Sequence, residues 1–280
     1  MSHKKAYLHI GAAKCASSLI QRILNEQGSK DLVPIRYMDA LSRVIQSYSP
    51  VMDFSDHFTI ETYRSIKEQL PKEDILFSVE NVFGMHSHRP NSYAETTKVL
   101  EYLFEGYDIK ILFFVRRQDT YLASNYNQDV TRGETRTFED YIEECLMDNF
   151  HWFNVAENYS AFDLTVLPFE KKVLETGGYK DFMDGLYQWL GQKVEVTNLP
   201  HINPSLTTPA MEVQRFANYM LTQQEAYDLS LWMEKHCPKK LGDPPEEIEG
   251  GGKILAHYKE SNKKLFKKYM PQFDGSYYWR

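Results

Sequence analysis

Short apolar runs alternate along the chain with longer stretches in which apolar residues recur every three or four positions. The runs Ala6–Ile10, Ile75–Val79, Ile109–Val115 and Leu164–Leu167 have the length and composition of buried β-strands. A weaker strand is expected near Leu32–Ile35. Strands that alternate with helices favour an α/β fold with a mostly parallel central sheet.

Helical periodicity fills the intervals between these strands and dominates the last third of the chain. It begins at Leu19 and then predicts helices over Met38–Tyr48, Ile60–Gln69, Tyr93–Glu105, Gln118–Thr131, Phe138–Asp148, Tyr179–Leu190, Pro209–Met220, Gln223–Lys235 and Ile254–Tyr269. We find no repeat or linker, so we expect one domain over residues 1–280 with a helical extension over about 200–280. The run Gly250–Lys253 follows no strand and is interpreted as a flexible hinge between helices.

The first predicted strand ends in a loop of small residues that carries one lysine and two hydroxyls. The loop consists of Gly11, Ala12, Ala13, Lys14, Cys15, Ala16, Ser17 and Ser18. The N-terminus of the helix that follows would present free backbone N–H groups and the positive end of its dipole. Small side chains let an anion approach, and Lys14 adds a full positive charge. The loop is therefore a candidate phosphate or sulfate site; the alternative is an ordinary turn with a surface lysine.

The spacing of this loop differs from that of the nucleoside triphosphatases. Their loop has Gly, four residues and then Gly-Lys-Ser/Thr, whose hydroxyl binds magnesium. Here Gly11 precedes Lys14 by three positions, and hydroxyls follow the lysine only at Ser17 and Ser18. The segment instead resembles the 5′-phosphosulfate loop of sulfotransferases that use 3′-phosphoadenosine-5′-phosphosulfate (PAPS). Cys15 stands where that family has a hydroxyl, and Ala16 stands where it has glycine.

A second segment resembles the 3′-phosphate motif of the same family. In that motif an arginine at the end of a strand is followed eight residues later by a serine, as Arg116 and Ser124 are here. A guanidinium donates two parallel hydrogen bonds to a phosphate, and a hydroxyl on the helix adds a third. Arg117 could exchange roles with Arg116, although the spacing favours Arg116. The alternative is a solvated arginine pair before a helix.

Glu80 ends the strand that begins at Ile75, and Ser78–Asn81 resembles a segment of the polysaccharide-type sulfotransferases. The resemblance implies that Glu80 is the general base that takes the proton of the acceptor hydroxyl. The end of a central strand can hold a carboxylate in a fixed position for that role. The alternative is an ion pair between Glu80 and Lys14 or Arg116.

Soluble-type sulfotransferases use a histidine as the base, and His86 and His88 are the nearby candidates. Together with Arg89 they could also form a basic rim for an anionic acceptor. Loop histidines more often contact substrate or nothing, so Glu80 is preferred as the base.

The resemblance covers most of the chain, from Tyr7 to about Tyr269, and includes features of bacterial members. It implies a three-layer fold like that of P-loop NTPases and a transferase that moves the sulfuryl group of PAPS to a hydroxyl of a carbohydrate or small molecule. Lys14 would stabilise the leaving phosphate of the product 3′-phosphoadenosine-5′-phosphate (PAP), and no metal would be required. Two rivals stay open: a P-loop kinase-like phosphotransferase and a non-catalytic nucleotide-binding protein.

Composition bears on the binding partners and the cellular compartment of this protein. A formal net charge of −7 argues against a general nucleic-acid binder, so anion binding has to be local. No stretch approaches the roughly 18 apolar residues of a membrane span, and we expect no signal sequence. Cys15, Cys145 and Cys237 lie far apart without metal-ligand spacing, which suits a reducing cytoplasm, although one disulfide stays open. The oligomeric state is not predicted.

Overall fold

A computed structural model describes residues 4–12, 14–15, 17–26, 36–38, 57–80, 93–169, 179–192, 206–237, 248 and 250–280. The chain forms two compact units. Unit 1 comprises Met1–Arg116, Leu146–Leu199 and Tyr258–Arg280, and unit 2 comprises Arg117–Cys145 and Pro200–His257. The organisation of the chain as a single domain stays a prediction.

Unit 1 is built on a parallel β-sheet. Its described strands are β1 (Lys4–Gly11), β2 (Arg36–Tyr37), β3 (Ile75–Glu80), β4 (Tyr107–Val115) and β5 (Asp163–Pro168). They lie in the order β2-β3-β1-β4-β5, and each neighbouring pair is parallel. The predicted α/β fold with a parallel central sheet is therefore confirmed. The segment Leu32–Ile35 lies outside the described residues, and the pairing of β2 begins at Arg36.

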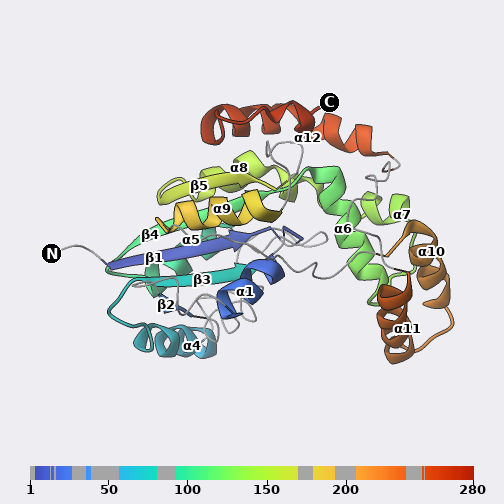
Figure 1. Ribbon diagram of the computed structural model, residues 1–280, viewed down its shortest axis with the longest axis horizontal. Helices are drawn as coiled ribbons and strands as arrows, with labels where there is room; N and C mark the ends of the chain where they lie inside the picture. The colour runs from blue at the N-terminus through green and yellow to red at the C-terminus, as the bar shows by residue number, and fades with distance from the viewer. Residues whose placement is uncertain are drawn as a thin grey trace. The chain divides into compact units, whose positions relative to one another are not determined.

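Helices cover both faces of this sheet (Figure 1). The helical segments of unit 1 are α1 (Ser17–Glu26), α4 (His57–Glu68), α5 (Tyr93–Leu103), η2 (Met147–Phe150), α8 (Trp152–Asn158), α9 (Tyr179–Trp189), η3 (Gly275–Tyr278) and the Tyr258–Tyr269 part of α12 (Gly251–Tyr269). On one face the ring of Tyr7 packs edge-on against Trp189 of α9, with 5.3 Å between centroids. On the other face Phe113 packs edge-on against Trp152 of α8 at 6.1 Å. The three-layer arrangement is thus confirmed within unit 1.

One predicted helix, one missed helix and one predicted hinge need correction. The helix predicted over Phe138–Asp148 ends at Glu143, and the chain then passes through η2 into α8, which the periodicity did not predict. Both Phe150 and Trp152 are fully buried, so burial of these rings explains the break better than local propensity. Of the predicted hinge, Gly251, Gly252 and Lys253 form the first turn of α12, and Gly250 directly precedes it.

The helix predicted over Met38–Tyr48 lies outside the described residues except at its first position. The backbone N–H of Met38 donates to the carbonyl of Leu76 at 2.9 Å, which extends the contact between β2 and β3. Met38 itself is therefore not helical.

Unit 2 is helical in its described residues. Its helices are α6 (Gln118–Val130), α7 (Phe138–Glu143), α10 (Thr208–Ala217), α11 (Gln223–His236) and the first residues of α12. The side-chain amide of Asn218, after α10, donates to the carbonyls of Val130 and Glu134, both at 2.8 Å. Arg215 donates to the carbonyl of Thr135 at 3.1 Å. These bonds tie α10 to the end of α6, which explains why segments distant in sequence form one unit.

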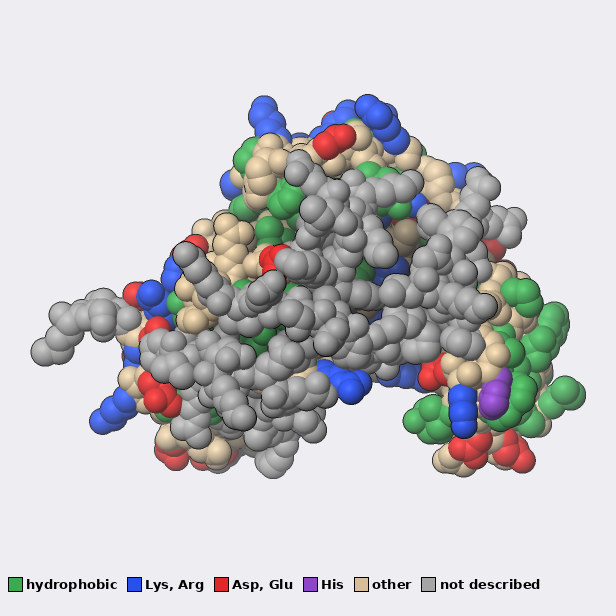
Figure 2. All heavy atoms as spheres, in the orientation of Figure 1, with side chains coloured by type: hydrophobic (Ala, Val, Ile, Leu, Met, Phe, Trp, Pro, Cys, Tyr) green, Lys and Arg blue, Asp and Glu red, His purple; other side chains and the backbone are tan. Residues whose placement is uncertain are grey.

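The surface of α10 and α11 carries large hydrophobic side chains (Figure 2). The exposed members are Val213, Phe216, Tyr219, Met220, Tyr227, Leu231 and Trp232. No described helix has both the length and the hydropathy that a membrane crossing requires. Cys15, Cys145 and Cys237, which all lie in the described part of the chain, form no disulfide.

Glu134 in unit 2 gives the stability of the fold a dependence on acid pH. The side chain of Arg136 and two backbone N–H groups donate to its carboxylate and lower the pKa of Glu134 from 4.5 to about 2. The charged carboxylate is favoured in the folded state, so its contribution is complete above pH 4.5 and is lost as the pH falls toward 2. Between pH 5 and pH 3 we expect the unfolding free energy to drop by about 1–2 kcal/mol more in the wild type than in Glu134→Gln. Urea titrations of both proteins measure this difference, and equal drops would contradict the assignment.

Candidate functional site

Gly11 and Ser17 bring the two ends of the loop between β1 and α1 close together. A Cβ atom on Gly11 would lie 2.6 Å from Ser17 Oγ and 3.3 Å from His9 Nε2, so a larger residue would displace the Ser17 side chain or the backbone. Ser17 begins α1 and is 1% exposed, and its Oγ has no hydrogen-bond partner among the described residues. An unpaired buried hydroxyl at a helix N-terminus, beside a backbone without Cβ, can receive an anion.

Lys14 occupies the turn of this loop in a left-handed conformation. Its φ is +66°, and among the described residues it is the one non-glycine residue with positive φ. That conformation costs about 1–2 kcal/mol. The guanidinium of Arg116 compensates by donating from Nη1 to the Lys14 carbonyl at 2.9 Å. The arginine that directly follows β4 therefore contacts the backbone of the loop that follows β1, and strain held in this way is typical of functional sites.

The backbone around Arg116 is itself held by aromatic segments of unit 1. Trp152 Nε1 donates to the Arg116 carbonyl at 2.7 Å. The Tyr278 hydroxyl and the Phe169 N–H both donate to the Val115 carbonyl, at 2.9 and 2.8 Å. The guanidinium carbon of Arg116 lies 5.6 Å from the centroid of the Phe169 ring. Trp152 and Tyr278 were not predicted as site residues, because nothing local in the sequence indicates such long-range contacts.

Arg117 makes a different contact from Arg116. Its Nε and Nη2 donate to the two carboxylate oxygens of Asp119 at 2.7 and 2.8 Å, within unit 2. Of the two arginines, Arg116 is therefore the better candidate for a role at the loop. Ser124 lies half-buried on α6, also in unit 2, so its pairing with Arg116 rests on the sequence spacing.

His9 is a polar residue of the site region that the sequence analysis missed. It is 0% exposed in β1, and burial lowers the pKa of its imidazole to about 3, so the ring is neutral. Its Nδ1 lies 2.9 Å from Ser78 Oγ, and its Nε2 has no partner among the described residues. The Ser78 carbonyl accepts from Gln21 Nε2 of α1 at 3.0 Å. The available signal was one polar residue inside an apolar strand, two positions before the loop glycine.

The other predicted site residues fall into two groups. The backbone of Glu80 pairs with Gly11 at the end of β3, so Glu80 and the loop share the carboxyl edge of the sheet, where ligands of parallel sheets bind. Ala12 and Cys15 are fully buried in the loop, Lys14 is half-exposed and Ser18 is exposed. The residues that lie outside the described part of the chain are Ala13, Ala16, His86, His88 and Arg89.

A surface hollow lies at the opposite edge of the sheet, near the amino ends of β1, β4 and β5. It is lined in part by Lys5, Asp108 and Lys110. Lys110 forms an ion pair with Asp163 there. The amino ends of parallel strands are not where such sheets bind ligands. This hollow is therefore a weaker candidate than the loop.

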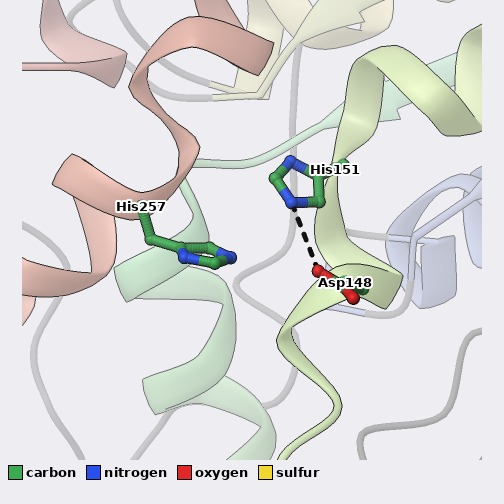
Figure 3. Close-up of side chains that lie close together, drawn as sticks. All are labelled: Asp148, His151 and His257. Atoms are coloured by element: carbon green, nitrogen blue, oxygen red, sulfur yellow. Dashed lines mark ion pairs between the residues drawn. The ribbon is translucent and has the colours of Figure 1, made fainter.

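Asp148 and His151 form a second polar contact of unit 1, outside the loop (Figure 3). His151 Nε2 lies 3.7 Å from Asp148 Oδ1, and the Asp148 side chain is 94% exposed. The His151 ring packs edge-on against Tyr258, with 5.0 Å between centroids. Figure 3 also draws His257, which belongs to unit 2. A 3.7 Å contact to a carboxylate as exposed as that of Asp148 contributes little to stability.

Comparison with known proteins yields matches among solved structures alone. No family model and no curated protein matches the chain. Mouse sulfotransferase SULT7A1 complexed with PAP is 14% identical, over 98% of this chain and 88% of that chain, with a TM-score of 0.42. Retinol dehydratase in complex with androsterone and inactive cofactor PAP is 11% identical, over 94% and 81%, with a TM-score of 0.33. The PezAT chromosomal toxin-antitoxin system of Streptococcus pneumoniae is 14% identical, over 60% and 69%, with a TM-score of 0.29.

Similarity at these TM-scores does not decide a function. The function therefore has to be argued from the residues of the loop and of the strand ends.

The close approach of Gly11 and Ser17 predicts that even one added methyl group damages the loop. We expect Gly11→Ala to lower the unfolding free energy by about 1–3 kcal/mol, because overpacking displaces the Ser17 side chain or the backbone. Gly252→Ala is the matched control, since no atom lies within 4 Å of a Cβ at that position of α12. It should be neutral or stabilising by up to about 1 kcal/mol. Urea titration measures both changes, and a Gly11→Ala protein as stable as the wild type would contradict the close approach.

Proposed function

We propose that this protein is a PAPS-dependent sulfotransferase that acts on a hydroxyl of a carbohydrate or small metabolite. The observation that carries the proposal is the hydrogen bond from Arg116 Nη1 to the Lys14 carbonyl. It joins the two segments whose spacing resembles the 5′-phosphosulfate and 3′-phosphate motifs. A nucleotide with phosphates at both positions is the ligand that would require an anion loop and an arginine side by side.

The loop residues fit an anionic group. Gly11 has no Cβ, and a Cβ at this position would collide with Ser17 Oγ. The buried Ser17 hydroxyl lacks a partner among the described residues. In this proposal the backbone of residues 11–18 and the hydroxyls of Ser17 and Ser18 hold the 5′-phosphosulfate. Arg116 and Ser124 hold the 3′-phosphate, and a guanidinium matches phosphate geometry better than an ammonium does.

PAPS would supply an activated sulfuryl group and leave as PAP. Glu80 accepts the proton of the acceptor hydroxyl while the acceptor oxygen bonds to sulfur and the bond from sulfur to the 5′-phosphate oxygen breaks. The Lys14 ammonium balances the negative charge that develops on that phosphate oxygen. By analogy with phosphoryl transfer, the protein contributes positioning and charge stabilisation rather than covalent chemistry.

Cys15 argues against the kinase-like alternative. A nucleoside triphosphatase loop places a hydroxyl directly after the lysine to bind magnesium, and magnesium prefers oxygen ligands. Here that position carries a fully buried thiol. A glycan or small-molecule acceptor and a cytoplasmic setting complete the proposal, and His86, His88 and Arg89 are proposed acceptor contacts.

Sulfuryl transfer from radiolabelled PAPS to a pool of glycan and metabolite acceptors tests this function. We expect Glu80→Gln to reduce transfer at least about 100-fold, since general-base catalysis contributes about 10²–10⁴. Glu101→Gln, an exposed carboxylate on α5, is the matched control and should retain full activity. EDTA should leave the rate unchanged.

Three outcomes would contradict parts of this account. Labelling of no acceptor would contradict the enzyme assignment, and activity abolished by EDTA would favour the kinase. Full turnover in Glu80→Gln would remove Glu80 as the base and move His86 and His88 into that role.

A further inference from the structure

Two buried polar atoms without partners lie beside the same glycine. His9 is 0% exposed and Ser17 is 1% exposed, and neither His9 Nε2 nor Ser17 Oγ has a hydrogen-bond partner among the described residues. Both atoms lie within 3.3 Å of the point where a Cβ of Gly11 would be. A buried polar group without a partner costs about 1–3 kcal/mol, so two of them at one place call for a functional explanation.

The two ring nitrogens of His9 have different surroundings. His9 and Ser78 are register partners on β1 and β3, and Nδ1 lies 2.9 Å from Ser78 Oγ. The ring is neutral and so carries one proton. When the Ser78 hydroxyl donates to Nδ1, that proton is on Nε2, which makes Nε2 a hydrogen-bond donor toward the loop. The edge of the Phe114 ring packs against the imidazole, with 5.5 Å between centroids, and limits its rotation.

We propose that His9 positions the Ser17 hydroxyl for anion binding. Nε2–H of His9 donates to Ser17 Oγ, and the Ser17 O–H then donates to an oxygen of the anion in the loop. Since both atoms are unpaired in the structure, the Ser17 side chain turns toward His9 when the anion binds. Identification of the anion as the 5′-phosphate of the nucleotide rests on the proposed function.

This chain of hydrogen bonds assigns a role to each polar residue around the loop. In this chain the Ser78 hydroxyl donates to His9 Nδ1, and His9 Nε2–H donates to a lone pair of Ser17 Oγ. The one proton of Ser17 is then left for the ligand. Hydrogen bonds in such a chain strengthen one another in a buried environment. His9 is thus a positioning residue, since it reaches the ligand through Ser17 alone.

Two substitutions of His9 separate this role from simple packing. His9→Gln places an amide N–H near the position of Nε2, whereas His9→Asn keeps an amide near Nδ1 and cannot reach Ser17. We expect His9→Gln to bind PAP within about 3-fold of the wild type and His9→Asn to lose about 10-fold, because one charge-assisted hydrogen bond weakens. If His9 acted through its contact with Ser78 alone, His9→Asn would bind PAP more tightly than His9→Gln.

A double-mutant cycle with Ser17→Ala tests the coupling. In the Ser17→Ala background, His9→Asn should cause no further loss of PAP affinity, because the chain of hydrogen bonds from His9 through Ser17 to the ligand (the relay) is already broken. Ser261→Ala removes another buried hydroxyl without a partner among the described residues, on α12, and should leave PAP affinity unchanged. Calorimetry measures the affinities, and urea titration of each variant confirms that it folds.

Nitrogen NMR of the wild type provides a test that does not depend on the variants. The proton of His9 should be on Nε2, and the Nε2 resonance should shift when PAP is added. A proton on Nδ1 of His9 would overturn the relay. If the wild type binds PAP and the losses of PAP affinity caused by His9→Asn and Ser17→Ala are additive, the relay is also overturned. If the wild type binds pyrophosphate but not PAP, the proposed function fails, and the same cycle with pyrophosphate then decides the relay. Binding of neither ligand would overturn both proposals.

Discussion

The hydrogen bond from the Arg116 guanidinium to the carbonyl of Lys14 is the interaction on which the candidate site depends. It holds Lys14 in a left-handed conformation that a non-glycine residue does not adopt without cost. It also joins the end of β4 to the loop after β1. Trp152 and Tyr278 in turn hold the backbone at Arg116 and Val115. Residues from distant parts of unit 1 therefore fix the position of one cation beside one loop.

Much of this arrangement follows from the sequence because it depends on local patterns. The strands that carry the site are continuous apolar runs. The location of the site at the carboxyl edge of the sheet follows from the rule that parallel sheets bind ligands at the carboxyl ends of their strands. Gly11, Lys14 and Arg116 were predicted in this way. The backbone pairing of Gly11 with Glu80 agrees with that picture, whereas the roles of these residues stay proposals.

The parts that were missed depend on contacts between distant residues. His9 reads in the sequence as one residue of an apolar strand, and its interest comes from Ser78 on β3 and Ser17 on α1. The helix α8 was missed because burial of Trp152, rather than helical periodicity, determines where it begins. Gly251 and Gly252 carry a low intrinsic helix propensity, yet they begin α12, where Gly251 is buried and Gly252 is exposed.

The loop departs from the sulfotransferase pattern at two positions. At Cys15 a fully buried thiol stands where the family has a hydroxyl. Ala16 lies outside the described residues. The anion-binding argument rests instead on Gly11, Lys14 and Ser17.

The central claim is that the loop and Arg116 together receive a nucleotide with phosphates at both the 5′ and 3′ positions. Calorimetric titration with PAP and with ADP tests it most directly, in the wild type and in Arg116→Lys. Arg117→Lys is the control, because Arg117 pairs with Asp119. We predict that the wild type binds PAP about 10–100-fold more tightly than ADP, as expected for charge-assisted hydrogen bonds to a second phosphate. Arg116→Lys should remove most of this preference and Arg117→Lys should keep it. Equal or tighter binding of ADP by the wild type would contradict the account.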